Sequence, residues 1–237
     1  ATTEIYTLSL HDALPIYLLG GQSDDYVVSI PSPFARENIE VIIQPLSTRY
    51  RDREKTIEPM VHFFKDVIDK KQGNFLIFFP SYQYMRNAYE QFTEHYPDVS
   101  TIIQDIGMSE AEREDFLAEF NSERDTRLVG FAVLGGIFSE GVDLKGDRLE
   151  GVIVVGVGMP QIGFERDIMK NYFQSVGKNG FDYAYVYPGM NKVLQAGGRL
   201  IRTDSDTGVI ALIDDRFLQK KYQALLPYEW QHYKIGL

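Results

Sequence analysis

Short, almost uninterrupted apolar runs recur along this chain, separated by segments with helical periodicity. The runs are rich in β-branched and aromatic side chains and lie at residues 39–43, 74–80, 100–103, 127–133, 151–157 and 208–214. Strands that are apolar on both sides are typical of a sheet covered by helices on both faces. Alternation with helical segments indicates right-handed βαβ units, so we expect an α/β fold with a mostly parallel sheet.

The segments between these runs carry the helix signals. Residues 56–71 and 82–95 place apolar side chains at helical spacing, and Ser109 and Glu112 form a capping box before a third helix. The sequence contains no repeat and no low-complexity tract, and the proline-spaced residues 29–40 are the best candidate for a domain boundary. One domain, preceded by a short segment of another, is the simplest organisation.

The composition excludes several classes of site. The chain has no cysteine, so it cannot supply thiolate ligands to zinc or to an iron–sulfur cluster. Its four histidines, at positions 11, 62, 95 and 232, show no ligand-like spacing, so we predict no metal site. No apolar run is long enough to span a membrane and no signal peptide is recognisable, so we expect a cytoplasmic location. The net charge of −10 argues against a broad basic nucleic-acid surface but allows a narrow groove.

The first sixteen residues, ATTEIYTLSLHDALPI, differ in character from the rest of the chain. They match, residue for residue, one reading frame of a common sequencing adapter. We therefore expect residues 1–16 to be translated adapter and exclude them from the fold. The alternative is a genuine N-terminal segment, which an in-frame genomic start codon upstream of Ala1 would support.

Ligands of an open parallel sheet bind beyond the carboxyl ends of its strands. We expect three segments of this chain to lie at those ends. The first is Pro80, Ser81 and Tyr82, which follows an apolar run and precedes a helix. One interpretation is that Ser81 only caps the N-terminus of the following helix. The functional interpretation is a phosphate seat formed by helix amides and a hydroxyl, with Tyr82 offering a ring for stacking.

The second segment, GGIFSEGVDL, follows another apolar run and has glycines on both sides of Ser139 and Glu140. Glycines allow the backbone to approach a ligand closely. Glu140 and Asp143 are candidates for a pair of catalytic carboxylates. The alternative is a tight turn in which these acids cap neighbouring amides.

The third segment, QAGGRLIR, places Arg199 and Arg202 three residues apart on one helix face. Such a pair can clamp phosphate, yet the chain contains no GxxxxGK[ST] loop to hold a nucleotide. The alternative is a surface pair bonded to nearby acids such as Asp204 and Asp206. The stretch GVGMPQ begins like a dinucleotide fingerprint, but Gln161 occupies the position of the third glycine, so we do not expect a Rossmann domain.

In order and spacing, FFPSYQYM, GGIFSEGVDLKGDRLEGVIVVGVGMP and QAGGRLIRTDSDTGVIALIDDRF resemble motifs four, five and six of the second RecA-type lobe of the XPD/DinG branch of superfamily-two helicases. The resemblance runs from about residue 17 to the C-terminus. It implies a RecA-like, P-loop-type three-layer αβα sandwich over residues 39–237. Residues 17–38 would then be the end of the first lobe and the crossover into the second.

The resemblance also implies a set of roles. In this family ATP and Mg²⁺ are held mainly by the first lobe, and the second lobe supplies groups that meet the γ-phosphate when the cleft closes. The matching positions for that role are Arg199, Arg202 and Gln195. Further nucleotide contacts are implied for Glu140, Gly141, Asp143 and Gly198. Contacts with single-stranded DNA are implied for Ser81, Tyr82 and Ser139.

The phosphate loop, the magnesium-binding acids and the iron–sulfur cysteines of the family are absent from these 237 residues. We therefore expect the chain alone not to hydrolyse ATP, and the missing N-terminal RecA-like lobe to be its partner. The intact protein is expected to move along single-stranded DNA with 5′→3′ polarity. One alternative is a free-standing nucleotide-responsive module that pairs with a separate motor subunit. Another is an unrelated α/β enzyme, such as a methyltransferase.

Overall fold

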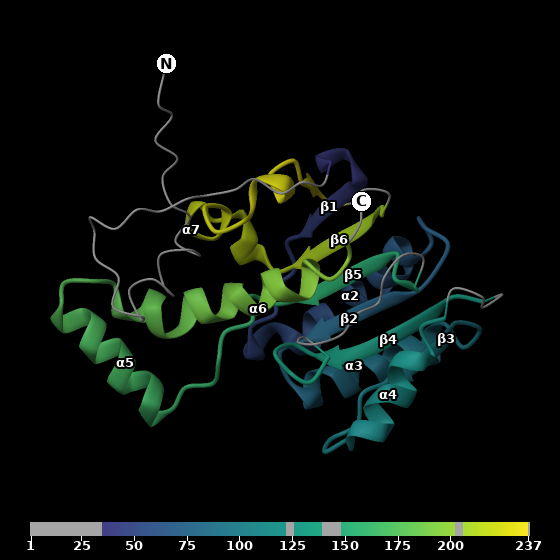
Figure 1. Cartoon of the computed structure of the whole chain (residues 1–237), viewed down its shortest axis with the longest axis horizontal. Helices are drawn as coiled ribbons and strands as arrows, with labels where there is room; N and C mark the ends of the chain where they lie inside the picture. The colour runs from purple at the N-terminus through teal and green to yellow at the C-terminus, as the bar shows by residue number, and fades with distance from the viewer. Residues whose placement is uncertain (1–34, 122–125, 139–147, 202–205, 237) are drawn as a thin grey trace.

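The computed structural model describes residues 35–121, 126–138, 148–201 and 206–236 (Figure 1). Within these residues seven strands form one parallel sheet, in the order β3-β4-β2-β5-β6-β1-β7. The strands are β1 (Ile39–Gln44), β2 (Phe75–Phe79), β3 (Ser100–Ile103), β4 (Leu128–Val133), β5 (Gly151–Val155), β6 (Gly208–Ile213) and β7 (Lys234–Ile235). The first six lie at the apolar runs of the sequence, which confirms the predicted parallel sheet; the two-residue β7 was not predicted.

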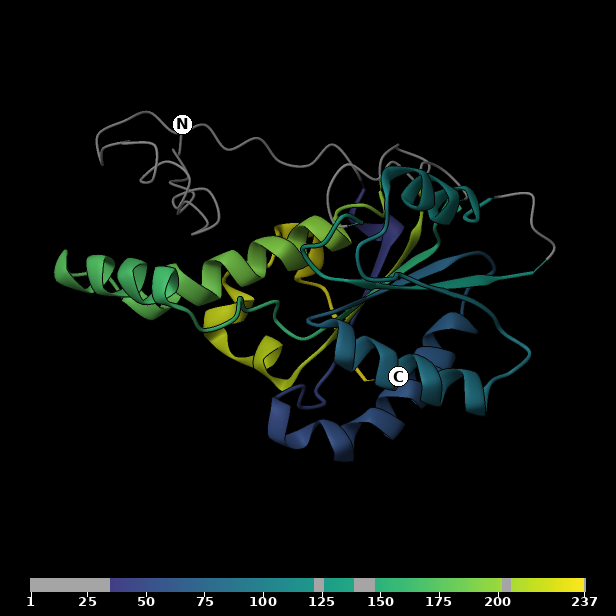
Figure 2. The same cartoon turned by 90° about the horizontal axis from the view of Figure 1, so that it is seen from below.

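Helices cover both faces of the sheet, as Figure 2 shows. The helices are α2 (Arg53–Ile68), α3 (Tyr82–His95), α4 (Glu110–Ala118), α5 (Phe164–Ser175), α6 (Tyr187–Gly197) and α7 (Lys220–Gln223). Buried side chains of α2 and α3 pack on one face, and those of α4, α6 and α7 pack on the other. The expected three-layer α/β architecture is therefore confirmed. The capping box of Ser109 and Glu112 is also present at the start of α4.

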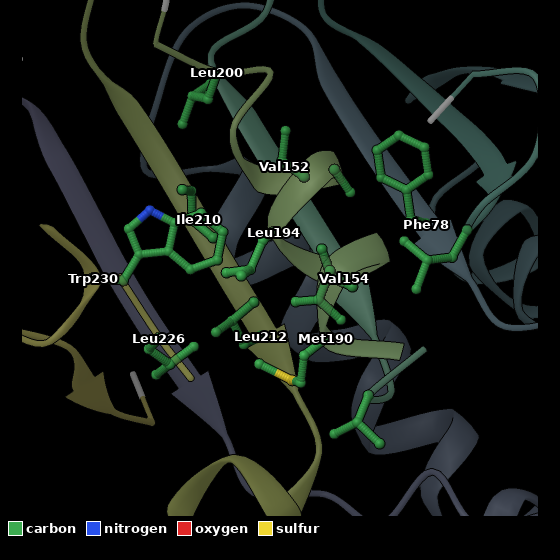
Figure 3. Packing of buried hydrophobic residues seen from close by; sticks show 14 of the residues in the cluster. Phe78, Val152, Val154, Met190, Leu194, Leu200, Ile210, Leu212, Leu226 and Trp230 are labelled. Atoms are coloured by element: carbon green, nitrogen blue, oxygen red, sulfur yellow. The ribbon is translucent and has the colours of Figure 1, made fainter. Parts of the chain in front are cut away.

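Each central strand contributes side chains to both hydrophobic cores. Along β5, Val152 and Val154 belong to the core beneath α6, whereas Ile153 and Val155 belong to the core beneath α2 and α3. All five residues of β5 are buried, so no side of the strand faces water. Figure 3 shows Val152 and Val154 among the side chains packed against α6. This double burial explains why the runs show no apolar–polar alternation.

Helix α5 is the exception to this packing, and it reaches beyond the sheet in Figure 1. Phe164, Ile168 and Tyr172 lie one helical turn apart, and their exposed fractions are 79%, 54% and 60%. Only Phe173 of this helix is buried. A short π-helical stretch, Asp182–Val186, then leads directly into α6. Neither α5 nor the π-helical stretch was predicted from the sequence.

Candidate functional site

The described part of the arginine segment, residues 195–201, lies between the end of α6 and the start of β6, at the amino end of that strand and not at a carboxyl end. Helix α6 begins beside the loop that follows β5, because a Cβ on Gly189 would lie 2.5 Å from the carbonyl oxygen of Val157. The helix ends at the start of β6, where a Cβ on Gly208 would lie 2.7 Å from Leu200 Cδ1. Figure 3 shows Met190 and Leu200 at opposite ends of the packed cluster. The expectation that all three candidate segments lie at carboxyl ends of strands was wrong for the arginine segment. A crossover helix such as α6 runs back along the sheet and ends at the amino end of the next strand.

The described residues of this segment divide into a buried apolar set, Ala196, Gly197, Leu200 and Ile201, and a set that solvent reaches. Gln195 and Gly198 are exposed, and Arg199 is half-buried. The backbone beneath them is fixed by packing, since a Cβ on Gly197 would lie 2.2 Å from the ring of Trp230. The Arg199 backbone amide donates to the carbonyl of Ala196, which continues the helical path past its last full turn. Arg202 lies outside the described residues, so its place beside Arg199 stays a prediction.

Ser81 and Tyr82 do lie at a carboxyl end, between β2 and α3. Ser81 is the N-cap of α3, and its hydroxyl oxygen accepts from the backbone amide of Tyr84 at 3.4 Å. The capping interpretation of Ser81 is therefore confirmed. A hydroxyl group that accepts a hydrogen bond keeps its own hydrogen for donation, so the cap is compatible with a second contact to a phosphate oxygen. The DNA contact itself stays a prediction.

A buried glutamine that the sequence analysis missed holds Tyr82 in place. Gln104 Nε2 donates to the Tyr82 hydroxyl at 2.9 Å, and Gln104 Oε1 accepts from the backbone amide of Val133 at 2.8 Å. Gln104 follows β3, and Val133 ends β4, so one side chain ties three carboxyl-end segments together. Gln104 is only 1% exposed, which makes both hydrogen bonds costly to lose. A single glutamine after a strand gave no sequence signal for this role.

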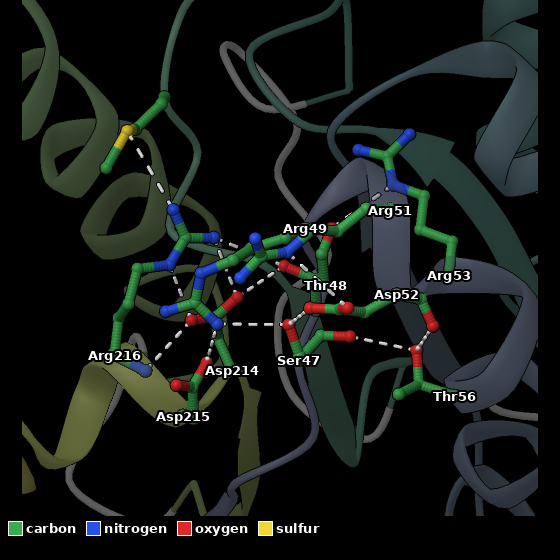
Figure 4. A network of polar contacts seen from close by, with 11 residues as sticks. Ser47, Thr48, Arg49, Arg51, Asp52, Arg53, Thr56, Asp214, Asp215 and Arg216 are labelled. Atoms are coloured by element: carbon green, nitrogen blue, oxygen red, sulfur yellow. Dashed lines mark hydrogen bonds and ion pairs between the residues drawn. The ribbon is translucent and has the colours of Figure 1, made fainter.

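A polar network links the carboxyl ends of β1 and β6 (Figure 4). Asp214 is fully buried, and its carboxylate accepts two hydrogen bonds from the Arg216 guanidinium, at 2.6 and 2.8 Å. Thr48 donates its hydroxyl to the same carboxylate. Burial opposes ionisation of Asp214, but the hydrogen bonds and charge of Arg216, together with Thr48, outweigh it and hold the pKa below its ordinary value.

The loop after β1 brings further arginines to this edge. Arg49 donates to Asp215 at 2.6 Å, and Arg53 donates to the carbonyl of Thr48 at 3.1 Å. The Arg53 guanidinium also lies 4.3 Å from the centre of the Tyr84 ring, one turn into α3. This places a cation close to the N-terminus of α3, next to the proposed phosphate seat. The alternating pattern STRYRDR after the first apolar run is the signal that could have pointed to it.

The glycine-rich segment after β4 is described only in part. Gly135 has a φ of +75°, which favours glycine, and a Cβ there would lie 2.9 Å from Lys192 Nζ of α6. The start of the segment therefore packs on the helix that precedes the arginines. The other predicted residues of this segment lie outside the described residues: Ser139, Glu140, Gly141 and Asp143. Their predicted contacts with nucleotide and DNA stay predictions.

The glycines of GVGMPQ have a packing role. Gly158 has a φ of +65°, and a Cβ on it would lie 2.6 Å from the carbonyl oxygen of Gly189. Backbone therefore meets backbone where the loop after β5 crosses the start of α6. This close approach accounts for Gly158 without a dinucleotide, and the φ of +83° at Gly156 favours glycine there.

Comparison with known proteins decides the family. The model of the helicase C-terminal domain family matches residues 64–233, well over half of the chain. This chain belongs to the helicase C-terminal domain family. Its matched region contains the Ser81–Tyr82 loop, the segment after β4 and the arginine segment, which are the three motifs that carried the resemblance.

This helicase C-terminal domain is similar in sequence to proteins named as helicases, DinG among them. It is 27% identical over 209 residues to the ATP-dependent DNA helicase DinG of Salmonella typhimurium, covering 85% of this chain and 28% of the relative. It is 30% identical over 218 residues to the regulator of telomere elongation helicase 1 homolog of Oryza sativa subsp. japonica, covering 78% of this chain and 21% of the relative. The chain thus spans less than a third of either relative's length.

Solved structures confirm the fold of this helicase C-terminal domain. The structure described as XPD_APO superposes with a TM-score of 0.67 at 18% identity, covering 84% of this chain and 40% of that one. The S. tokodaii Xpd4 structure gives a TM-score of 0.64 at 16% identity, covering 91% of this chain and 41% of that one. The predicted RecA-like second-lobe fold is therefore confirmed. Among the residues that the structure describes, none of the helices has the length and apolar character that crossing a bilayer requires.

Proposed function

We propose that this helicase C-terminal domain is the second motor lobe of an ATP-dependent DNA helicase, and that it supplies Arg199 and Arg202 to a nucleotide seated on another lobe. The observation that carries the proposal is the place of Arg199, on a packed helix end at the amino edge of the sheet and still accessible. A guanidinium keeps its charge at every relevant pH and can contact two phosphate oxygens at once. It is therefore suited to neutralising charge that develops on the γ-phosphate during hydrolysis.

The nucleotide and its Mg²⁺ would be held mainly by a first RecA-like lobe. No GxxxxGK[ST] loop occurs in the 237 residues, so the chain by itself lacks the usual cradle for the phosphates. Gln195 and Gly198, which are exposed next to Arg199, would complete the contact surface together with Glu140, Gly141 and Asp143. The chain alone would then show no ATP hydrolysis above background.

Single-stranded DNA would run over the opposite, carboxyl edge of the sheet. The N-terminus of α3 offers backbone amides and the Ser81 hydroxyl to a phosphate, and the Tyr82 ring offers a stacking surface. Arg53, against the Tyr84 ring, adds positive charge beside this seat. Ser139 would extend the same contact.

Reconstitution tests this function. The chain is joined to a first lobe that carries a GxxxxGK[ST] loop, and its hydrolysis of ATP is measured with and without single-stranded DNA. We expect DNA-stimulated hydrolysis in the joined protein and none in the chain alone. The Arg113→Ala variant serves as the control and should retain full activity, because Arg113 lies on α4, pairs with Glu110 and has no proposed contact with nucleotide or DNA. Hydrolysis by the chain alone, or a joined protein that DNA does not stimulate, would contradict the proposal.

A further inference from the structure

Three metal-ligating side chains meet on the surface of the two helices that cover one face of the sheet. Glu58 and His62 are one turn apart on α2, and His95 is the last residue of α3. One ligand atom of each lies within 4.8 Å of the others, and all three residues are exposed. The sequence analysis predicted no metal site because these histidines are far apart along the chain. The packing of α2 against α3 removes that separation.

Hydrogen bonds orient both imidazole rings. His95 Nδ1 lies 2.8 Å from the carbonyl oxygen of Gln91, which can only accept, so Nδ1 carries the hydrogen in this contact. The neutral ring then presents the lone pair of Nε2 to its surroundings. His62 Nδ1 lies 2.6 Å from the hydroxyl of Tyr96, a partner that can accept in the same way. An imidazole that donates its second nitrogen to an oxygen is the usual arrangement of a metal-bound histidine.

We propose that Glu58, His62 and His95 form a binding site for a divalent transition-metal ion, with Zn²⁺ as the preferred occupant. Two imidazoles and one carboxylate are a common ligand set for Zn²⁺, which takes a water molecule as its fourth ligand when the protein supplies three. Mg²⁺ and Ca²⁺ prefer oxygen ligands and are not expected to compete. The site lies on the outer surface of α2 and α3 and is separate from the nucleotide and DNA contacts proposed above.

The bound ion would join α2 to the end of α3. The two rings already lie edge to face, with centroids 5.2 Å apart, so binding requires side-chain adjustment and no movement of the helices. Because the folded chain brings the ligands together and the unfolded chain does not, the ion stabilises the folded state. All three side chains are reached from solvent, so the ion should exchange readily with the solution.

Calorimetric titration of the untagged full chain with ZnCl₂ tests the site. We expect one ion per chain, and a loss of affinity of at least about tenfold in each of the variants His62→Ala, His95→Ala and Glu58→Gln. The matched control is Glu54→Gln, an exposed glutamate one turn earlier on α2, which should bind Zn²⁺ as the unchanged chain does. MgCl₂ in place of ZnCl₂ should give no saturable heat.

Thermal unfolding gives an independent readout. Zn²⁺ should raise the unfolding temperature of the unchanged chain and of Glu54→Gln, and leave that of His95→Ala unchanged. Circular dichroism without metal checks that the substituted chains, whose changes lie on the surface, fold normally. Absence of saturable Zn²⁺ binding, or binding that persists when His62 and His95 are both replaced by alanine, would overturn the proposal.

Discussion

Replacing Asp214 with asparagine should destabilise the domain strongly, because it removes the charge of a fully buried carboxylate. Asp214 accepts hydrogen bonds from Thr48, from the Arg216 guanidinium and from the Arg216 backbone amide. Asparagine has nearly the same volume but only one acceptor oxygen, and it leaves the guanidinium, whose side chain is 18% exposed, without its counter-charge. Breaking a buried ion pair from one side costs about 3–5 kcal/mol. Since asparagine retains one acceptor, we expect about 3 kcal/mol.

The neighbouring residue provides a matched control. Asp215 also binds an arginine, Arg49, at 2.6 Å, but the two side chains are 40% and 33% exposed. Solvent screens such a pair, so Asp215→Asn should cost only about 0–1 kcal/mol. The two substitutions therefore make the same chemical change at adjacent positions, which differ in burial and in the number of hydrogen bonds that the carboxylate accepts.

Urea denaturation followed by circular dichroism measures both variants under identical conditions. In a thermal scan of the same proteins, a loss of about 3 kcal/mol in the free energy of unfolding would lower the unfolding temperature by about 6–12 °C for a domain of this size. Equal effects of Asp214→Asn and Asp215→Asn, or a loss below about 1 kcal/mol for Asp214→Asn, would refute the view that the Thr48–Asp214–Arg216 network holds β1 to β6.

Three further predictions follow from the same structure. The pKa of Asp214 is lowered in the folded state by the Arg216 guanidinium and Thr48, so its contribution to stability is fully present above the unfolded pKa of about 3.9 and is lost progressively as the pH falls from there through the lower folded-state pKa. In urea denaturation the difference in unfolding free energy between Asp214→Asn and the unchanged chain should therefore be constant from about pH 7 to pH 5 and shrink as the pH falls below about 3.9. Gly189→Ala should lower the free energy of unfolding, measured by urea denaturation, by about 1–3 kcal/mol, because the new Cβ would lie 2.5 Å from a backbone oxygen. Gly163→Ala should change it little, because no atom lies within 4 Å of the new Cβ. Tyr82→Ala should weaken binding of single-stranded DNA, measured by fluorescence anisotropy, by about 1–3 kcal/mol, while Tyr82→Phe keeps the ring and most of the affinity; equal losses would reject stacking.

The sheet could be predicted from the sequence because burial on both faces leaves long apolar runs, and β2 and β5 show this plainly. Helix α3 could be predicted because Ser81 and the apolar stripe after it mark its start and its buried face. Helix α5 was missed although its apolar side chains Phe164, Ile168 and Tyr172 recur at helical spacing, and all three are exposed in the structure.

The residues of the candidate site could be predicted from their types and motifs, but the position of the arginine segment on the sheet was predicted wrongly. Arg199 follows a crossover helix, and the rule that such a helix returns to the amino end of the next strand would have placed it correctly. Other contacts could not be predicted from local pattern. Thr48 meets Asp214 only because β1 lies beside β6, and His62 meets His95 only because α2 packs against α3.

The most direct test of the central claim is the DNA-stimulated ATP hydrolysis of the joined two-lobe protein carrying Arg199→Ala, with Arg199→Lys beside it. An arginine that stabilises the transferring phosphoryl group contributes roughly 10³–10⁵-fold in rate. We expect Arg199→Ala to lower the rate at least about a thousandfold, and lysine to restore little because it cannot contact two oxygens at once. A loss smaller than about tenfold, with unchanged ATP and DNA binding, would contradict it.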